Sequence, residues 1–298
     1  MHLNLNRNDI SSVPTELGDA GTQLRKLVLG RNQISVIPPG IFSQMAALTK
    51  LNLRANQLFE LPSDIGSLSG LTDLNLGGNH LDALPADLGN LRNLQILNLR
   101  ANQLTKLPSS IGNLTALVSL GICGNRLRKL PSEIGSLVRL RSLDLDRNLL
   151  KHIPSEIGHL TDLSHVILGK NQLTDVPPEL GKLTALTHLD LSHNKLKILP
   201  PELGHLTNLT FLHLSRNKLI SLPPEIGRLA NLAHLELSDN KLRRLPYDLW
   251  NLERLDYAFF KNNPFVLRVS PGLEELLHGS IEFLTFDTLM LLVSEMST

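Results

Sequence analysis

The sequence is poor in several features that would place it in common functional classes. Its 298 residues include one cysteine, and a single thiol cannot form an internal disulfide, which argues against an oxidising compartment. The 29 basic and 28 acidic residues leave a net charge of +1, so bulk charge does not make it a coat for a polyanion. No basic-then-apolar leader follows Met1, and no apolar run approaches the roughly 18 residues that span a bilayer. We therefore expect a cytoplasmic protein without a membrane span.

Motifs with established catalytic or nucleotide-binding mechanics are also missing. The chain contains no G-x-x-x-x-G-K-[ST], H-E-x-x-H, G-x-S-x-G, G-x-G-x-x-G or C-x-x-C. Cys123 falls at an inward-facing strand end, but no histidine stands beside it to activate the thiol. The sequence therefore predicts a protein that is not an enzyme, with no catalytic residues and no cofactor.

What the sequence does contain is an internal repeat. An asparagine recurs from Asn8 to Asn263, first at intervals of 24 residues and then at intervals of 23. Around it runs the pattern L-x-x-L-x-L-x-x-N-x-L-x-x-L-P-x-x-I/L-G-x-L, which residues 94–114 show intact. Proline and glycine at fixed places in this unit exclude a heptad coiled coil.

Each repeat predicts a short strand followed by a compact return. Leu97 and Leu99 have period 2, so they point to one side of a strand and the residues between them to the other. Successive strands are expected to form one parallel sheet, about 4.8 Å apart. The return is too short and too rich in proline and glycine for a long helix, which favours extended or 3₁₀ turns. The repeated asparagine amide has donors and an acceptor for backbone groups of its own and neighbouring turns.

The pattern resembles the leucine-rich repeat family over residues 3–265. The L-P-x-x-I-G-x-L signature, as in residues 130–137, is most similar to its Ras-group subclass, which includes intracellular Ras-pathway scaffolds, plant intracellular Ras-group proteins and the Scribble/Erbin group. The resemblance implies an α/β solenoid, a horseshoe with a parallel β-sheet on the concave face and extended or 3₁₀ turns on the convex face. We expect about twelve repeats over residues 1–265, the first incomplete and the last degenerate, and a short helical C-terminal cap over residues 266–298.

The two ends of the chain leave alternatives open. The sequence from Met1 begins with the strand part of a repeat, and no capping segment comes before it, which predicts an open sheet edge. That edge suggests edge-to-edge self-association, cover by a partner, or a chain that is a fragment of a longer protein. Near the other end, residues 289–296 have the spacing of an amphipathic helix, which would act as a lid on the last repeat or as a docking element.

Function in this architecture is expected at the inward-facing strand positions, which vary from repeat to repeat. From the seventh repeat onward these positions carry acids, histidines and aromatic residues, the usual components of hot spots in protein interfaces. The candidate partner-binding residues are Asp144, His165, His188, Asp190, Phe211, His213, His234, Glu236, Tyr257 and Phe259. Of these, Phe211, Tyr257 and Phe259 are the expected apolar anchors. A secondary basic patch comprises Arg7, Lys26, Arg31, Lys50, Arg54 and Arg100.

Other uses of the same residues are less favoured. His165 and His188 fall on adjacent strands, and Asp190 and His213 occupy the next inward-facing position of neighbouring strands. No group of these residues has the short sequence spacing that holds metal ligands together, so we predict no metal site. Protonation of the histidines beside Asp190 and Glu236 predicts instead that binding depends on pH. The basic patch has almost no interleaved aromatic residues, and we predict no nucleic-acid partner.

The leading functional hypothesis is a protein–protein interaction scaffold with its partner on the concave face. The family resemblance implies a place in small-GTPase (Ras-type) signalling, with a small GTPase or a phosphatase complex as partner. Two alternatives stay open: a substrate-recognition subunit of a ubiquitin ligase, and a recognition fragment of a larger receptor or multidomain protein. The identity of the partner cannot be inferred from the sequence.

Overall fold

The computed structural model describes residues 1–265, which divide into two compact units. Unit 1 is Met1–Leu149, and unit 2 is Leu150–Thr298, described as far as residue 265. The predicted helical cap over residues 266–298 lies outside the described residues. In the part of the chain that is described, no helix has the length and apolar character needed to cross a membrane.

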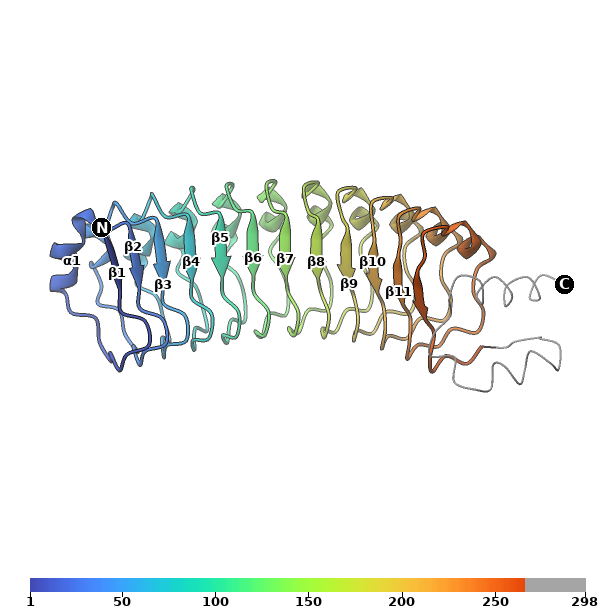
Figure 1. Cartoon of the computed structure of the whole chain (residues 1–298), viewed down its shortest axis with the longest axis horizontal. Coiled ribbons are helices and arrows are strands. Elements are labelled where there is room, and N and C mark those ends of the chain that lie inside the picture. The colour runs from blue at the N-terminus through green and yellow to red at the C-terminus, as the bar shows by residue number, and fades with distance from the viewer. Residues whose placement is uncertain (266–298) are drawn as a thin grey trace. The chain divides into compact units, whose positions relative to one another are not determined.

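Unit 1 is a stack of repeats whose strands pair in parallel, in chain order (Figure 1). Its strands are β1 (His2–Asn4), β2 (Lys26–Val28), β3 (Lys50–Asn52), β4 (Asp73–Asn75), β5 (Ile96–Asn98), β6 (Ser119–Gly121) and β7 (Ser142–Asp144). Its helices are α1 (Glu16–Ala20), η1 (Gly21–Gln23), η2 (Phe42–Gln44), η3 (Ser63–Ser67), η4 (Ala86–Asn90), η5 (Ser109–Asn113) and η6 (Ser132–Ser136). The register is uniform, with Lys26 opposite Lys50 and Leu27 opposite Leu51, so equivalent positions of the repeats form rows.

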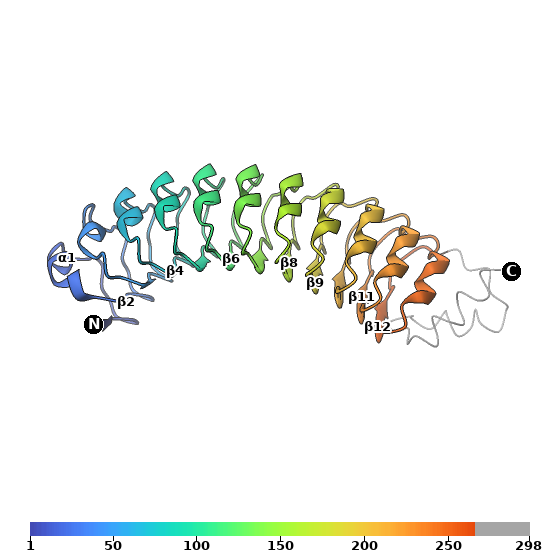
Figure 2. The ribbon, with the colours of Figure 1, turned by 90° about the horizontal axis from the view of Figure 1, so that it is seen from above.

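Unit 2 repeats the same arrangement. Its strands are β8 (His165–Ile167), β9 (His188–Asp190), β10 (Phe211–His213), β11 (His234–Glu236) and β12 (Tyr257–Phe259). Its helices are η7 (Ser155–His159), η8 (Pro178–Lys182), η9 (Pro201–His205), η10 (Pro224–Arg228) and η11 (Tyr247–Asn251). Figure 2 shows that in each unit the turns stack on the side away from the strands. The predicted fold class, a leucine-rich repeat solenoid with a parallel sheet and 3₁₀ returns, is confirmed.

One return differs from the predicted 3₁₀ turn. Residues Glu16–Ala20 form the α-helix α1, followed by the 3₁₀ turn η1. The first repeat has 24 residues, and its return from Val13 to Leu24 is one residue longer than the returns of the 23-residue repeats. The second repeat has a return of the same length, from Ile37 to Leu48, and forms the 3₁₀ turn η2, so the length of the return alone does not determine the helix type.

Columns of leucine build the core of each unit. In the repeat at residues 94–114, Leu97, Leu99, Leu104 and Leu107 are no more than 5% exposed. Each such burial contributes about 1.5–3 kcal/mol. The glycine of the signature has a steric reason, because a Cβ on Gly112 would lie 2.7 Å from the carbonyl oxygen of Glu133 in the next turn. The stacked turns are therefore too close together for a side chain at this position.

The repeated asparagines form the predicted hydrogen-bond ladder. The amide nitrogen of Asn102 donates to the carbonyl oxygens of Leu99 in its own repeat and Leu76 in the preceding one, both at 3.0 Å. Its Oδ1 accepts from the backbone N–H of Leu81 at 3.1 Å. Asn102 is 7% exposed, so these bonds satisfy backbone groups that water does not reach. Each ladder asparagine thus ties one turn to the turn before it.

The residue before the ladder asparagine has a left-handed backbone conformation in each repeat of the described chain. Its φ is 53° at Ala101, 51° at Lys170 and 70° at Gly78. The bend needs this conformation whichever residue occupies it, and a residue with a Cβ costs about 1–2 kcal/mol there. The repeat pattern did not reveal the left-handed conformation of this bend, because the position holds arginine, alanine, lysine, histidine, aspartate or asparagine as well as glycine.

Candidate functional site

The first and third residues of every strand point away from the core and form the surface that we call the sheet face. In β9 and β11 the middle leucine is buried, whereas the residues on both sides of it are exposed or half-buried. This alternation is the one predicted from Leu97 and Leu99. Of the ten candidate partner-binding residues, nine lie on the sheet face of unit 2, and Asp144 lies on β7 of unit 1.

The first positions of β8–β12 bring five rings together in one row, which we call the aromatic ladder. The ring centroids of His165 and His188 are 4.5 Å apart and the planes are 12° from parallel. The ladder continues from His188 to Phe211 at 5.9 Å, from Phe211 to His234 at 6.1 Å, and from His234 to Tyr257 at 5.2 Å. Parallel in-register pairing produces this contact, because it places equivalent residues of neighbouring repeats side by side.

Neighbouring hydroxyl groups hold the first two rings in place. The Nδ1 atom of His165 lies 2.9 Å from Oγ of Ser164, and Nδ1 of His188 lies 2.9 Å from Oγ1 of Thr187. Tyr257, at the other end of the ladder, is 45% exposed. Rings that are already ordered lose little conformational entropy when a partner packs on them.

The third positions of the strands carry carboxylates that are already partly engaged. Oδ1 of Asp190 accepts the backbone N–H of Ser192 at 2.8 Å, and Oε1 of Glu236 accepts that of Ser238 at 2.9 Å. Asp144 makes the same bond within unit 1, to the N–H two residues along the chain. The sequence did not reveal this capping bond. It uses one oxygen of Asp190 and one of Glu236 and does not engage the second.

His213 connects the carboxylate row to the ladder. Its Nδ1 lies 3.6 Å from Oδ1 of Asp190, and its Nε2 lies 2.8 Å from Oγ of Ser215. The ring meets Phe211 edge-on, at 6.0 Å and 83°. The last predicted anchor, Phe259, is half-buried at the end of β12. The structure therefore places the unit 2 candidates on one continuous surface.

The pKa of His188 is lowered by its position in the ladder. Burial is the main reason that the pKa of His188 lies below its ordinary value, and the neighbouring His165 and His234 lower it further. Protonating His188 would place a positive charge near the rings of His165 and His234. His188 is therefore mainly neutral at pH 7, so it does not present a positive charge to a partner.

The histidines do not converge as metal ligands do. Within residues 1–265, no group of three or more His, Cys, Asp or Glu side chains is arranged to hold a metal ion. His165 and His188 stack almost face to face, and the nitrogen lone pairs lie in the ring planes, so they do not aim at a shared point between the rings.

Cys123 is buried two residues after the end of β6, with Sγ 3.9 Å from Oδ2 of Asp146. Burial raises the pKa of this thiol, and the nearby carboxylate of Asp144 raises it further. Since the thiolate is the nucleophilic form, this environment makes Cys123 less reactive than an ordinary cysteine.

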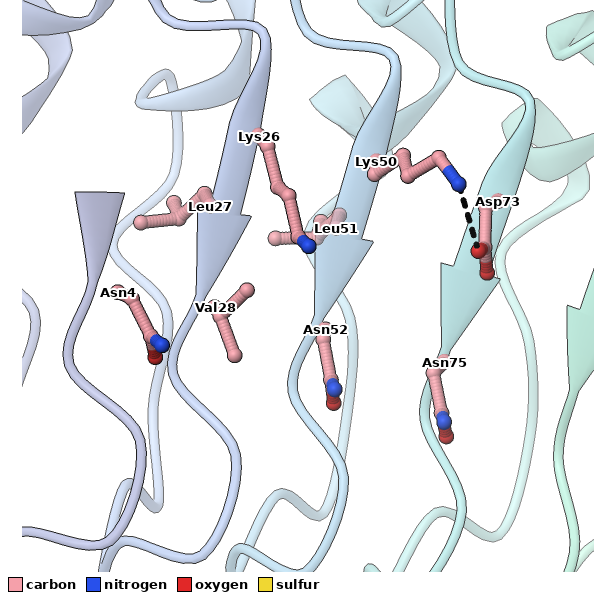
Figure 3. A pocket seen from close by; sticks show the side chains of 9 residues that line it. All are labelled: Asn4, Lys26, Leu27, Val28, Lys50, Leu51, Asn52, Asp73 and Asn75. Carbon is pink, nitrogen blue, oxygen red and sulfur yellow. Dashed lines mark ion pairs between the residues drawn. The ribbon is translucent and has the colours of Figure 1, made fainter. Parts of the chain in front are cut away.

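The six residues of the basic patch all lie in unit 1, on or just after β1–β5. Lys26 and Lys50 project from β2 and β3, beside a hollow of about 280 Å³ (Figure 3). The hollow is lined by Asn4, Lys26, Leu27, Val28, Lys50, Leu51, Asn52, Asp73 and Asn75. Lys50 Nζ is 3.8 Å from Oδ2 of Asp73, an exposed ion pair that adds little stability.

Two protein-family models match the sequence of this chain. A model described as "Leucine-rich repeat region" matches residues 62–126 and 119–215, which is more than half of the chain. A second model, "Leucine rich repeat", matches residues 1–58 and 207–265. The chain belongs to the leucine-rich repeat family. Its assignment to the Ras-group subclass stays a prediction.

This leucine-rich repeat protein is similar to solved structures of bacterial, plant and animal proteins. A leucine-rich repeat protein of Leptospira interrogans is 31% identical, with a TM-score of 0.64, and the match covers 92% of this chain and 80% of that one. A TDR receptor is 34% identical, with a TM-score of 0.78, over 88% of this chain and 47% of the receptor. Toll of Drosophila, in complex with Spatzle, is 31% identical, with a TM-score of 0.77, and the match covers 91% of this chain and 37% of Toll. The chain thus spans less than half of either receptor. A search of curated proteins found no match.

Proposed function

We propose that this leucine-rich repeat protein binds a protein partner through the sheet face of unit 2. The observation that carries the proposal is the aromatic ladder from His165 to Tyr257, in which five rings form an unbroken row on an accessible face. The core does not need these side chains, because the buried apolar residues at the middle of each strand already fill it. Ordered, accessible aromatic rings among hydrogen-bonding groups are the features from which protein-binding hot spots are built.

Several relatives of similar structure are described as complexes with protein or peptide ligands. They include PEPR1 with AtPEP1, the plant peptide hormone receptor RGFR1 with RGF2, and Toll with Spatzle. These relatives support a protein or peptide partner for this chain. Binding modules of this family are typically not enzymes, and we propose recognition rather than catalysis here.

The candidate residues then divide by role. Phe211, Tyr257 and Phe259 supply apolar contact area, and burial of each on binding contributes more than a rim charge does. The carboxylate oxygens of Asp190 and Glu236 that make no capping bond accept hydrogen bonds from the partner and fix its position along the row.

The Ras-group signature supports a more specific role, which is a cytoplasmic scaffold in small-GTPase signalling with a small GTPase or a phosphatase complex as partner. A recognition module of a larger receptor is the alternative that the relatives favour, since the chain spans 47% of the TDR receptor and 42% of PEPR1. The ubiquitin-ligase alternative depends on a docking helix at residues 289–296, which lies outside the described residues.

The test is the double substitution Phe211→Ala with Tyr257→Ala. Both side chains lie on the sheet face of unit 2, and each truncation at a hot spot costs about 2 kcal/mol of binding free energy or more. We expect the double variant to lose the partner that the unsubstituted protein captures, as measured by quantitative affinity capture and mass spectrometry. The melting temperature should stay close to that of the unsubstituted protein.

A matched control uses two exposed aromatic residues outside the strands. Phe59 is 61% exposed and Tyr247, in η11, is 66% exposed. The variant Phe59→Ala with Tyr247→Ala should retain the partner. Undiminished capture by the sheet-face variant would contradict the proposal, and so would an equal loss in both variants.

A further inference from the structure

The third strand position holds asparagine in β1, β3, β4 and β5 of unit 1 and an acid in β9 and β11 of unit 2. At the third strand position, each of these asparagines uses Oδ1 to accept the backbone N–H two residues along the chain. The bonds are Asn4 to Asn6 at 3.1 Å, Asn52 to Arg54 at 2.9 Å, Asn75 to Gly77 at 3.1 Å and Asn98 to Arg100 at 3.0 Å. The capping bond is thus the same one that Asp190 and Glu236 make in unit 2.

The capping bond determines which atoms of the amide remain available. An amide oxygen can accept from a backbone N–H and an amide nitrogen cannot, so the orientation of each side chain follows from its partner. With Oδ1 engaged, the Nδ2 group of Asn52 and of Asn75 presents N–H donors to the solvent. Figure 3 shows these two side chains on neighbouring strands, with Asn4 in the same row on the far side of Val28. The row offers donors where a row of acids would offer acceptors.

Basic side chains surround this row of donors. Lys26 and Lys50 are the first residues of β2 and β3, two residues before the third strand position, and exposed Arg54 and Arg100 follow two residues after the capping asparagines. Against the six basic residues of the patch, the sheet face of β1–β5 carries one carboxylate, Asp73, which pairs with Lys50. The surface is therefore built from donors and positive charge.

We propose that the sheet face of β1–β5 is a second binding surface, which takes an acidic, carboxylate-rich segment of a protein partner. Carboxylates are acceptors only, so they complement both the amide donors and the basic side chains. A protein segment fits better than a nucleic acid, because no phenylalanine, tyrosine or tryptophan stands on these strands for bases to stack on. Val28 and Ile96 provide apolar contact instead. The surface is separate from the aromatic ladder and does not depend on it.

The decisive variant is Asn52→Asp with Asn75→Asp. Aspartate keeps the capping bond, as Asp144 and Asp190 do in this same chain, but its outward atom is a charged acceptor rather than a donor. The backbone therefore retains its cap while the surface chemistry is reversed. A second variant, Lys26→Gln with Lys50→Gln, removes two positive charges without touching any cap.

The control for bulk charge is Lys106→Gln with Lys129→Gln. Both lysines are exposed in the return segments rather than on strands, and the pair changes the net charge by the same amount as the two sheet-face variants. Only the position of the change differs, so the comparison separates a local surface from a general electrostatic effect.

Binding can be measured by the fluorescence anisotropy of a labelled oligoglutamate peptide with the full chain at low ionic strength, where the Debye length is about 30 Å. We expect the unsubstituted protein to bind oligoglutamate and not oligolysine. Each sheet-face variant should weaken oligoglutamate binding by about tenfold or more, the effect of losing about 1.4 kcal/mol. The bulk-charge control and the variant Phe211→Ala with Tyr257→Ala should bind as the unsubstituted protein does.

Several results would overturn the proposal. The first is an unsubstituted protein that does not bind oligoglutamate, and the second is a bulk-charge control that weakens binding as much as the sheet-face variants. A third is tighter binding of a phosphoserine peptide of equal charge, which would assign the surface to phosphate. Because the aromatic-ladder variant is included, failure here is distinguishable from failure of the proposed function of unit 2.

Discussion

The two sheet faces of this protein solve the same structural problem with different chemistry. In unit 1 the capping atom at the third strand position comes from Asn52 or Asn98, and in unit 2 it comes from Asp190 or Glu236. One oxygen of each side chain serves the backbone in both units. What the capping bond does not use is a pair of amide donors in unit 1 and a carboxylate oxygen in unit 2. A position can therefore be constrained by the fold and still determine what the surface binds.

The first strand position differs from the third, because its side chain makes no capping bond to the backbone and does not fill the core. It carries Lys26 and Lys50 in unit 1 but His188 and Phe211 in unit 2, and the core beneath is leucine in each case. The shared frame can thus present a basic surface or an aromatic one. The predictions below test first what the two units share and then where they differ.

The largest effect should come from the ladder asparagines, and it should be equal in the two units. Asn102→Ala and Asn194→Ala each remove an amide that bonds backbone groups of its own and adjacent repeats. Each buried group left without a partner costs about 1–3 kcal/mol, so the free energy of unfolding should fall by several kcal/mol in both variants. Chemical denaturation with a probe in each unit measures this.

The control for that prediction is Asn113→Ala, since Asn113 is an exposed asparagine in η5 outside the ladder. Its effect should stay within about 0.5 kcal/mol, as for most surface substitutions. A ladder substitution that matters in one unit and not in the other would show that the frame is not shared.

The left-handed bend should give a smaller effect, of opposite sign at two positions of unit 1. Ala101→Gly relieves the cost of a Cβ at φ 53° and should stabilise the protein by about 1 kcal/mol. Gly124→Ala introduces that cost at φ 69° and should destabilise it by a similar amount. In unit 2, Lys170→Gly should stabilise as Ala101→Gly does. Melting temperatures measure all three, and destabilisation by both glycine substitutions would refute the account of the bend.

The capping bond should contribute about 1 kcal/mol in either unit, the typical net value of one hydrogen bond. Asp190→Ala and Asn98→Ala remove it, so both should destabilise. Asp190→Asn and Asn98→Asp keep it, so both should remain close to the unsubstituted protein in stability. Destabilisation by the isosteric changes equal to that by alanine would show that charge, rather than the capping bond, determines stability at this position.

The smallest effect is a dependence of unit 2 on pH. The folded protein holds the pKa of His188 below its ordinary value of 6.5, chiefly through burial, so the unfolded chain binds more protons as the pH falls below that value. Unit 2 should therefore lose stability on acidification through and below pH 6.5. His188→Phe keeps a ring in the ladder and should reduce this loss. Hydrogen exchange within β8–β10, measured above and below that pH, tests it, and an unchanged pH dependence in the variant would contradict it.

Much of the fold could be predicted from the sequence, because the same spacing of leucine, asparagine, proline and glycine occurs in one repeat after another. The period-2 leucines, the short proline-marked returns and the bonding role of Asn102 all follow from spacing and residue type. The left-handed bend at Ala101 and the capping by Asp190 could not be predicted. Neither position keeps one residue type, and a backbone N–H partner two residues away leaves no mark in the pattern.

The candidate surface was predictable only in outline. Column by column, the sequence placed His165, His188 and Phe211 on neighbouring strands, but their stacking depends on ring orientations that spacing does not determine. In the same way, the basic patch was visible as charge, whereas its row of amide donors required knowing which end of Asn52 faces outward.

Hydroxyl-radical footprinting of the protein with and without its captured partner shows whether the aromatic ladder is the binding surface. We predict that Phe211, His234 and Tyr257 lose reactivity in the complex, while Phe59 and Tyr247, exposed outside the strands, react as before. Unchanged reactivity of the three sheet-face residues, with protection of Phe59 or Tyr247 instead, would contradict it.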